Sequence, residues 1–155
     1  KLDILRRYQD VLESQQELFE GHIAYHQMFT FMVNNGIYDI INMNTFNFIN
    51  ATFDNLLYRY PTQAEFDAGY AMVENNSAAM LFGASGQNKA DYCAILVNSA
   101  EFHEGMVRWC YKTFLGREPS TYETYTAMAD FQMDRDLQKV QRRVLTSDEY
   151  ANIGS

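Results

Sequence analysis

The 155-residue sequence contains only two prolines, two cysteines and eight glycines. Proline and glycine are the residues that most often interrupt helices, so their scarcity permits long helical segments. Runs that alternate strictly between apolar and polar residues are also missing, whereas apolar residues recur at spacings of three and four almost throughout. We therefore predict an all-α fold, a compact helical bundle.

Basic residues are few as well, with 12 Lys and Arg against 20 Asp and Glu and a formal net charge of -8. They are scattered, apart from pairs such as Arg6-Arg7 and Arg142-Arg143, so no cationic stripe could follow a phosphate backbone. No stretch approaches the roughly 20 apolar residues that span a bilayer. The sequence predicts neither nucleic-acid binding nor membrane insertion, and it leaves protein, self or other, as the expected partner.

The two cysteines, Cys93 and Cys110, lie in segments that we predict to be helical, and neither belongs to a Cys-x-x-Cys pattern. Metal–thiolate sites and covalent haem are therefore not indicated. Buried free thiols are the favoured interpretation because free cysteine behaves as a small hydrophobic residue. A disulfide is the second.

The length matches one domain, so we predict a single all-α domain over residues 1–155. Residues 1–44 form its N-terminal helical segment, a long amphipathic helix interrupted near Gly21 and then short segments between Asn-rich turns. Residues 45–102 form a first helical module with an insertion loop near residues 75–88. Residues 103–150 form a second module.

The two modules are identified by an internal repeat. Arg59-Tyr60-Pro61-Thr62-Gln63-Ala64-Glu65 reappears 58 residues later as Arg117-Glu118-Pro119-Ser120-Thr121-Tyr122-Glu123, and the same offset relates apolar positions on both flanking helices. Ser99-Ala100-Glu101-Phe102 matches Ser147-Asp148-Glu149-Tyr150 at an offset of 48, so the first copy has ten extra residues. Each module reads as helix, proline-marked turn, helix, loop and helix.

The repeated motif has the composition of a helix start. Thr62 with Glu65, and Ser120 with Glu123, have the spacing of capping boxes, in which each side chain accepts a hydrogen bond from a backbone N–H of the first helical turn. An arginine stands two residues before each proline. We predict that Arg117 pairs with Glu149 and Arg59 with Glu101, since each copy repeats both partners. The structural motif comprises Arg59, Pro61, Thr62, Glu65, Glu101, Arg117, Pro119, Ser120, Glu123 and Glu149.

A resemblance accompanies this motif. Two segments carry this resemblance: Phe114-Leu115-Gly116-Arg117-Glu118-Pro119-Ser120 and, at the end of the module, Thr146-Ser147-Asp148-Glu149-Tyr150. Through them the chain resembles the short all-helical domain of uncharacterised function in bacterial secreted and surface proteins, which is similar to the phycobilisome linker domain. The resemblance covers residues 104–150 best, with a degraded copy over residues 46–102. It implies a non-catalytic, all-α module that serves assembly or forms an appendage of an extracytoplasmic protein.

Catalytic and metal-binding patterns are weak. His22 and His26 lie four residues apart, the spacing that lets two imidazoles on one helix face share a metal, but helix packing is the favoured interpretation. Gly83-Ala84-Ser85-Gly86 lacks the spacing of a nucleophile elbow. We therefore assign no catalytic residue and no cofactor.

The region from residue 25 to residue 60 is rich in aromatic side chains. In the favoured interpretation they fill a core, and in the alternative they line a ligand cavity. The favoured function is a structural or protein–protein interaction module, periplasmic, secreted or on the cell surface. The alternative is a helical small-molecule or metal-binding protein that uses His22 and His26.

Overall fold

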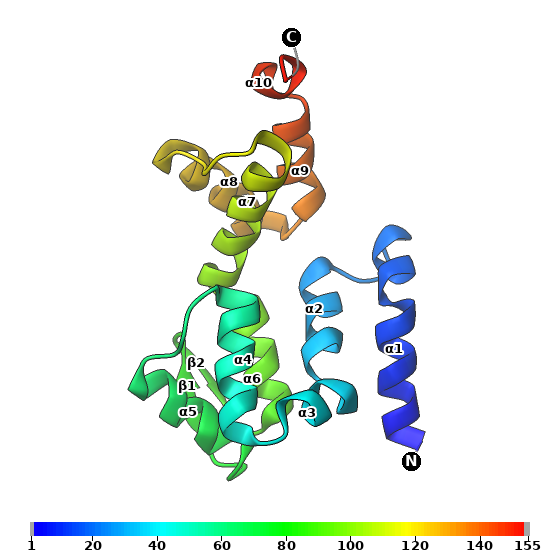
Figure 1. Cartoon of the computed structure of the whole chain (residues 1–155), viewed down its shortest axis with the longest axis vertical. Helices are drawn as coiled ribbons and strands as arrows, with labels where there is room; N and C mark the ends of the chain where they lie inside the picture. The colour runs from blue at the N-terminus through cyan, green and yellow to red at the C-terminus, as the bar shows by residue number, and fades with distance from the viewer. Residues whose placement is uncertain (1, 154–155) are drawn as a thin grey trace. The chain divides into compact units, whose positions relative to one another are not determined.

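The computed structural model describes residues 2–153, and the side chains of residues 4–131, 133 and 135–153 (Figure 1). The described residues form ten helices and one two-stranded antiparallel sheet, which confirms the predicted all-α class. Along the chain the elements are α1 (Leu2–Phe19), α2 (Tyr25–Val33), α3 (Gly36–Asn42), α4 (Thr45–Leu57), α5 (Gln63–Val73), β1 (Ala79–Leu81), β2 (Ala84–Gly86), α6 (Lys89–Asn98), α7 (Ala100–Leu115), α8 (Thr121–Asp134), α9 (Leu137–Leu145) and α10 (Asp148–Ala151).

The chain divides into two compact units, residues 1–99 and residues 100–155. The boundary lies close to the predicted boundary between the two modules, at residues 102 and 103. Each unit contains one copy of the predicted sequence of helix, proline-marked turn and helix: α4 and α5 in the first, α7 and α8 in the second.

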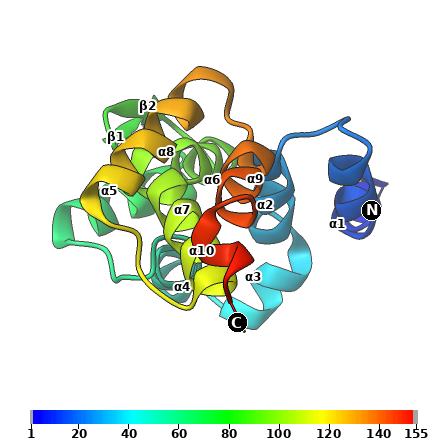
Figure 2. The same ribbon diagram turned by 90° about the horizontal axis from the view of Figure 1, so that it is seen from above.

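In the first unit, the N-terminal helix is interrupted near Gly21, as predicted, and the chain then folds back on itself. α1 ends at Phe19, and Gly21 then adopts a left-handed conformation with φ of 78° that ordinary side chains disfavour. α2 packs against α1, and Figures 1 and 2 both show α1 outside α2 at the edge of this unit. One face of α1 is therefore directed away from the core of the unit.

Asparagine residues begin the next two helices. The side chain of Asn35 accepts hydrogen bonds from the backbone N–H groups of Ile37 and Tyr38 at the start of α3. Asn44 accepts one from the backbone N–H of Asn47 at the start of α4. Asparagine is among the best N-cap residues, so the Asn-rich stretch marks two helix starts, in agreement with the predicted turn, short segment and turn.

The core of the first unit lies among α2, α4, α5, α6 and the small sheet. Tyr92 is fully buried at its centre, and its hydroxyl shares a hydrogen bond of 2.7 Å with the buried hydroxyl of Thr52. α5 approaches closely at Gly69, where a Cβ atom would lie 2.8 Å from the Tyr92 ring. The pairing of a large residue with a glycine thus fixes the spacing of α5 and α6.

The insertion predicted as a loop is in fact a β-hairpin. β1 and β2 pair in antiparallel register, with Ala79 opposite Gly86 and Leu81 opposite Ala84. The two turn residues, Phe82 and Gly83, both have positive φ, which matches the right-handed twist of the strands. Strands of three residues are too short to show alternation, which is why the composition of this segment indicated only a loop.

The second unit is built on α7, against which α8, α9 and α10 pack. Its buried apolar residues come from α7, α8 and α9 and include Phe102, Val107, Phe131, Val140 and Val144. α10 is a single turn whose N-cap, Ser147, accepts a hydrogen bond from the backbone N–H of Tyr150. This turn carries Glu149, the predicted partner of Arg117.

Among residues 2–153, none of the helices combines the length and the hydropathy that crossing a bilayer requires.

Candidate functional site

The proline-marked turn of the first unit is closed by a compact ion pair. The guanidinium of Arg59 donates two hydrogen bonds to the Glu65 carboxylate, at 2.8 and 2.7 Å. The same carboxylate accepts the backbone N–H of Thr62 at 2.7 Å, and the Thr62 hydroxyl accepts the backbone N–H of Glu65, so the predicted capping box is present. The guanidinium also lies over the Phe53 ring, 5.2 Å from its centroid.

The second unit repeats this arrangement almost group for group. Arg117 donates two hydrogen bonds to Glu123, at 3.0 and 2.8 Å, and Glu123 completes a capping box with Ser120. Its guanidinium lies over the Tyr111 ring at 5.4 Å. Tyr111 stands 58 residues after Phe53, the offset of the repeat. The two turns therefore share their geometry as well as their sequence motif.

The predicted pairing of Arg117 with Glu149 is also present. Arg117 Nε donates to Glu149 at 2.7 Å and a terminal nitrogen donates at 2.5 Å, so a single guanidinium binds two carboxylates. This ties α10 to the turn between α7 and α8. The equivalent pairing of Arg59 with Glu101 involves residues of different units and stays a prediction.

The two capping glutamates have unusual acidity because of these arginines. The hydrogen bonds from Arg59 lower the pKa of Glu65 to about 2, and those from Arg117 lower the pKa of Glu123 to about 2. Arg117 also lowers the pKa of Glu149. All these charges are satisfied by one another, so the repeated motif holds two turns together and presents no group poised for acid–base chemistry.

Each proline of the motif, Pro61 and Pro119, directly precedes the N-cap residue of its helix. Proline disfavours helical geometry in the residue before it, which separates α4 from α5 and α7 from α8. The left-handed residue that ends the preceding helix is Tyr58 in the first unit and Gly116 in the second. The turn is thus the same despite the different side chains.

The two histidines predicted to share a helix face do not do so. His22 lies in the turn after α1, whereas His26 lies in the first turn of α2, because Gly21 ends the helical segment before His22. His26 packs edge-on against Tyr25, with ring centroids 5.7 Å apart. The four-residue spacing of His22 and His26 therefore does not bring their imidazoles together as ligands of one metal.

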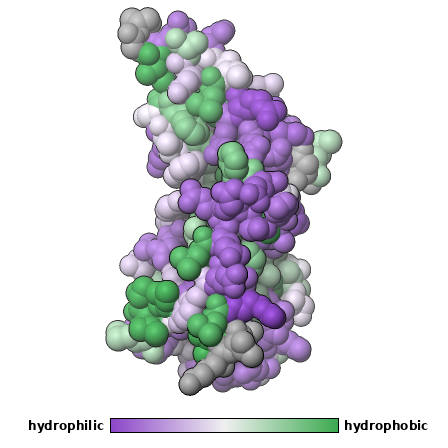
Figure 3. Space-filling view, turned by 90° about the vertical axis from the view of Figure 1, so that its right-hand side faces the viewer, coloured by the Kyte–Doolittle hydropathy of each residue, from purple (hydrophilic) through white to green (hydrophobic). Residues whose placement is uncertain are grey.

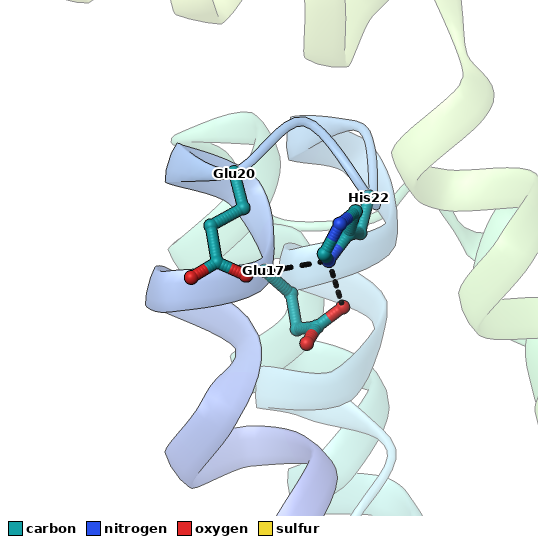
Figure 4. Close-up of side chains that lie close together, drawn as sticks. All are labelled: Glu17, Glu20 and His22. Atoms are coloured by element: carbon teal, nitrogen blue, oxygen red, sulfur yellow. Dashed lines mark hydrogen bonds and ion pairs between the residues drawn. The ribbon is translucent and has the colours of Figure 1, made fainter.

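His22 instead faces two carboxylates at the end of α1 (Figure 4). Its Nδ1 atom lies 3.2 Å from a carboxylate oxygen of Glu17 and 3.4 Å from one of Glu20. The three possible ligand atoms lie within 4.8 Å of one another, and among the residues described no other group of this kind is found. Sequence reasoning missed it because neither glutamate has a recognised ligand spacing to His22.

His103, the third histidine, belongs to the interior of the second unit. It is buried and stacks on Phe131, with centroids 5.5 Å apart. Cys93 and Cys110 are free thiols, fully buried, as the favoured interpretation of the sequence predicted. Burial raises the pKa of both thiols to about 12, which keeps them protonated and unreactive.

The aromatic residues of residues 25–60 divide between core and surface. Tyr25, Phe48 and Phe53 are buried, as the core interpretation requires, while Phe46 and Tyr60 are exposed. Two clefts are lined by charged and polar residues among others: one of about 250 Å³ by residues including Arg6, Arg7 and Asn34, and one of about 360 Å³ by residues including Glu104 and Arg108.

Exposed apolar side chains gather in the first unit, most densely on α3 and the residues that follow it. Ile40, Ile41 and Met43 are 74%, 68% and 79% exposed, and Ile37 and Phe46 beside them in sequence are more than half exposed. Figure 3 shows hydrophobic residues interrupting the polar surface in the part of the chain that contains α1 and α3. No sequence signal marks this face as exposed, because the three isoleucines of α3 have the i, i+3, i+4 spacing of an ordinary buried helix face.

Comparison of the chain with protein-family models, with curated proteins and with solved structures yields no match. The resemblance to the bacterial helical domain and the phycobilisome linker domain stays a prediction.

Proposed function

We propose that the chain is a non-catalytic structural or protein–protein interaction module of a bacterial extracytoplasmic protein, and that its first unit binds another protein. The observation that supports this proposal is the exposed apolar surface of α3 with Met43 and Phe46, which we call the α3 patch. Contiguous exposed apolar residues on a folded domain commonly mark interaction sites. The one charged side chain of α3, Asp39, is engaged by Lys89 of α6.

The repeated turns support the same function from another direction. Each arginine is committed to carboxylates of its own unit, so the motif stiffens the helical hairpins. A stiff helical frame holds a binding surface in place at low entropic cost. The extracytoplasmic setting rests on the resemblance stated above.

Site-specific photo-crosslinking in the cells that naturally produce the chain tests this function. A photoreactive amino acid replaces Ile40 in the α3 patch, and a matched variant carries it at Asn75, an exposed polar position of the same unit. We expect a discrete product containing a second polypeptide from position 40 and none from position 75. Equal products, or none from either position, would contradict the proposal.

Metal binding is a second candidate function, and the group of Glu17, Glu20 and His22 favours it. Two carboxylate oxygens and one imidazole nitrogen are ligands that zinc accepts in proteins. All three side chains are substantially exposed. Ordinary surface contacts of His22 with Glu17 and Glu20 are therefore the competing interpretation of this group.

Calorimetric titration with Zn²⁺ separates these readings. If the group binds zinc, His22→Ala abolishes a stoichiometric binding isotherm while His26→Ala preserves it. Loss of binding in both variants would instead support a site shared by the two histidines. An absence of saturable binding in the unmodified chain would eliminate the metal function.

A further inference from the structure

The outer face of α1 carries a regular apolar seam. Leu5, Leu12 and Phe19 follow one another at intervals of seven residues and are 63%, 83% and 82% exposed. Seven residues are close to two helical turns, so the three side chains lie in one row. The inner face of the same helix, with Val11, Ser14 and Leu18, is at least partly buried within the unit.

The seam has the composition of a coiled-coil contact. Gln9 and Gln16 lie between the apolar residues at the alternate heptad position, and both are exposed. Polar residues at such positions fix the register of paired helices at some cost in stability. Figure 3 looks onto the outer side of α1 and shows hydrophobic residues among polar ones there. The occupant that fits this face is another helix.

The charge distribution along α1 indicates which helix could pack against its outer face. Residues 1–10 carry a formal net charge of +1, including Arg6 and Arg7, whereas residues 11–20 carry -3 from Glu13, Glu17 and Glu20. This order opposes the helix dipole, which favours acidic residues at the start of a helix and basic residues at its end. The neighbouring helix in the unit, α2, contains no Asp, Glu, Lys or Arg, so it supplies no complement.

An antiparallel copy of α1 supplies that complement. One flank of the seam carries Arg6, Glu13 and Glu20, all exposed and again seven residues apart. In an antiparallel pair the same flank of both helices meets, so arginine meets glutamate twice. In a parallel pair this flank would meet the opposite one, which carries the uncharged side chains of Tyr8 and Gln15.

We propose that α1 binds α1 of a second copy of this chain in antiparallel orientation. Leu5, Leu12 and Phe19 of both copies form the contact, and Arg6 of each lies beside Glu13 of the other. The inference rests on the proposed function of an interaction module and names one partner for it. An 18-residue helix is about 27 Å long, so the contact is small and the dimer forms reversibly with concentration.

Sedimentation velocity of the full chain, from about 1 µM to about 1 mM, tests the proposal. We expect the sedimentation coefficient to rise with concentration. Leu12→Gln, which preserves helix propensity, should weaken association at least about tenfold, because buried central residues dominate such contacts. Met80→Gln removes another mostly exposed apolar side chain, from β1, and should leave association unchanged. Circular dichroism verifies that both variants are folded.

Charge reversal tests the orientation. Arg6→Glu and Glu13→Arg should each weaken association severalfold, and the double reversal should restore it, because the two charges meet across the antiparallel pair. A chain that stays monomeric throughout, or equal effects of Leu12→Gln and Met80→Gln, would overturn the proposal. Failure of the double reversal to restore association would overturn the antiparallel arrangement.

These outcomes are distinct from those of the crosslinking experiment at Ile40. A monomeric chain that still crosslinks through the α3 patch overturns the α1 dimer and leaves the proposed function in place. A chain that dimerises but gives no crosslink at Ile40 overturns the role of the α3 patch and leaves the α1 dimer in place.

Discussion

The two copies of the repeat differ at the residue that ends their first helix, and this difference has an energetic consequence. Tyr58 and Gly116 both adopt left-handed backbone conformations, with φ of 57° and 68°. A side chain is disfavoured in this conformation by roughly 1 kcal/mol, whereas glycine adopts it freely.

Tyr58→Gly should therefore stabilise the first unit by about 0.5 to 1 kcal/mol, since the Tyr58 side chain is mostly exposed and little packing is lost. Chemical denaturation measures the change. The matched variant, Gly116→Ala, should destabilise by about 1 kcal/mol, because a Cβ there meets no atom within 4 Å and only the backbone strain counts. Two changes of the same sign would contradict this account of the turn.

The acidity of Glu123 gives a second prediction at the scale of single residues. Its pKa in the folded chain is about 2, below its ordinary value of 4.5, so the stabilisation is complete above pH 4.5 and is lost as the pH falls toward 2. Glu123→Gln keeps a capping side chain but removes the charge. We expect it to lower the free energy of unfolding by about 1 to 3 kcal/mol at pH 7.

At pH 2.5 the same substitution should cost much less, because the glutamate of the unmodified chain is then largely protonated in the unfolded state and partly so in the folded state. Thermal unfolding at both pH values measures the difference. A cost independent of pH would show that the ion pair with Arg117 contributes nothing.

At the scale of elements, the two modules place a small and a larger residue at the same two positions, with different sizes in each module. Gly69 and Tyr92 meet in the first unit, and the offsets of the repeat place Ala127 and Val140, both buried, at the equivalent positions of the second. A smaller residue on one helix thus accompanies a larger one on the other. This exchange keeps the total volume similar.

Gly69→Ala should destabilise the first unit by about 1 to 2 kcal/mol even though alanine is the better helix former, because Tyr92 is held by Thr52 and cannot move aside. Urea unfolding is the measurement. In a Tyr92→Val background, which reproduces the pair of the second unit, the same change should be neutral or stabilising. Equal effects in both backgrounds would mean that the two positions are not coupled.

Elements also show where sequence reasoning reaches its limit. The capping boxes and the Arg117–Glu149 pair followed from the repeat, because capping is local chemistry that one spacing specifies. His22 and His26 did not share a face, because the left-handed Gly21 turn lies ahead of both and places only His26 in a helix. The β-hairpin was missed because its strands are shorter than any alternation that could identify them.

At the scale of the whole molecule, helical periodicity and the scarcity of proline predicted the fold class. The single domain with modules that meet at residues 102 and 103 stays a prediction. The exposed seam of α1 and the α3 patch were not predicted. An apolar residue at helical spacing has the same sequence signal whether it faces a core or a partner, so only the structure separates the two. The proposed function therefore rests on surfaces that periodicity alone cannot distinguish from core.

Native mass spectrometry of the chain, isolated under mild conditions from the cells that produce it, tests the interaction role most directly. The account predicts particles heavier than a single chain, composed of this chain with a second copy or another polypeptide and with no stoichiometric metal. A monomer that carries one metal ion, lost in His22→Ala, would contradict it and assign the molecule to metal binding instead.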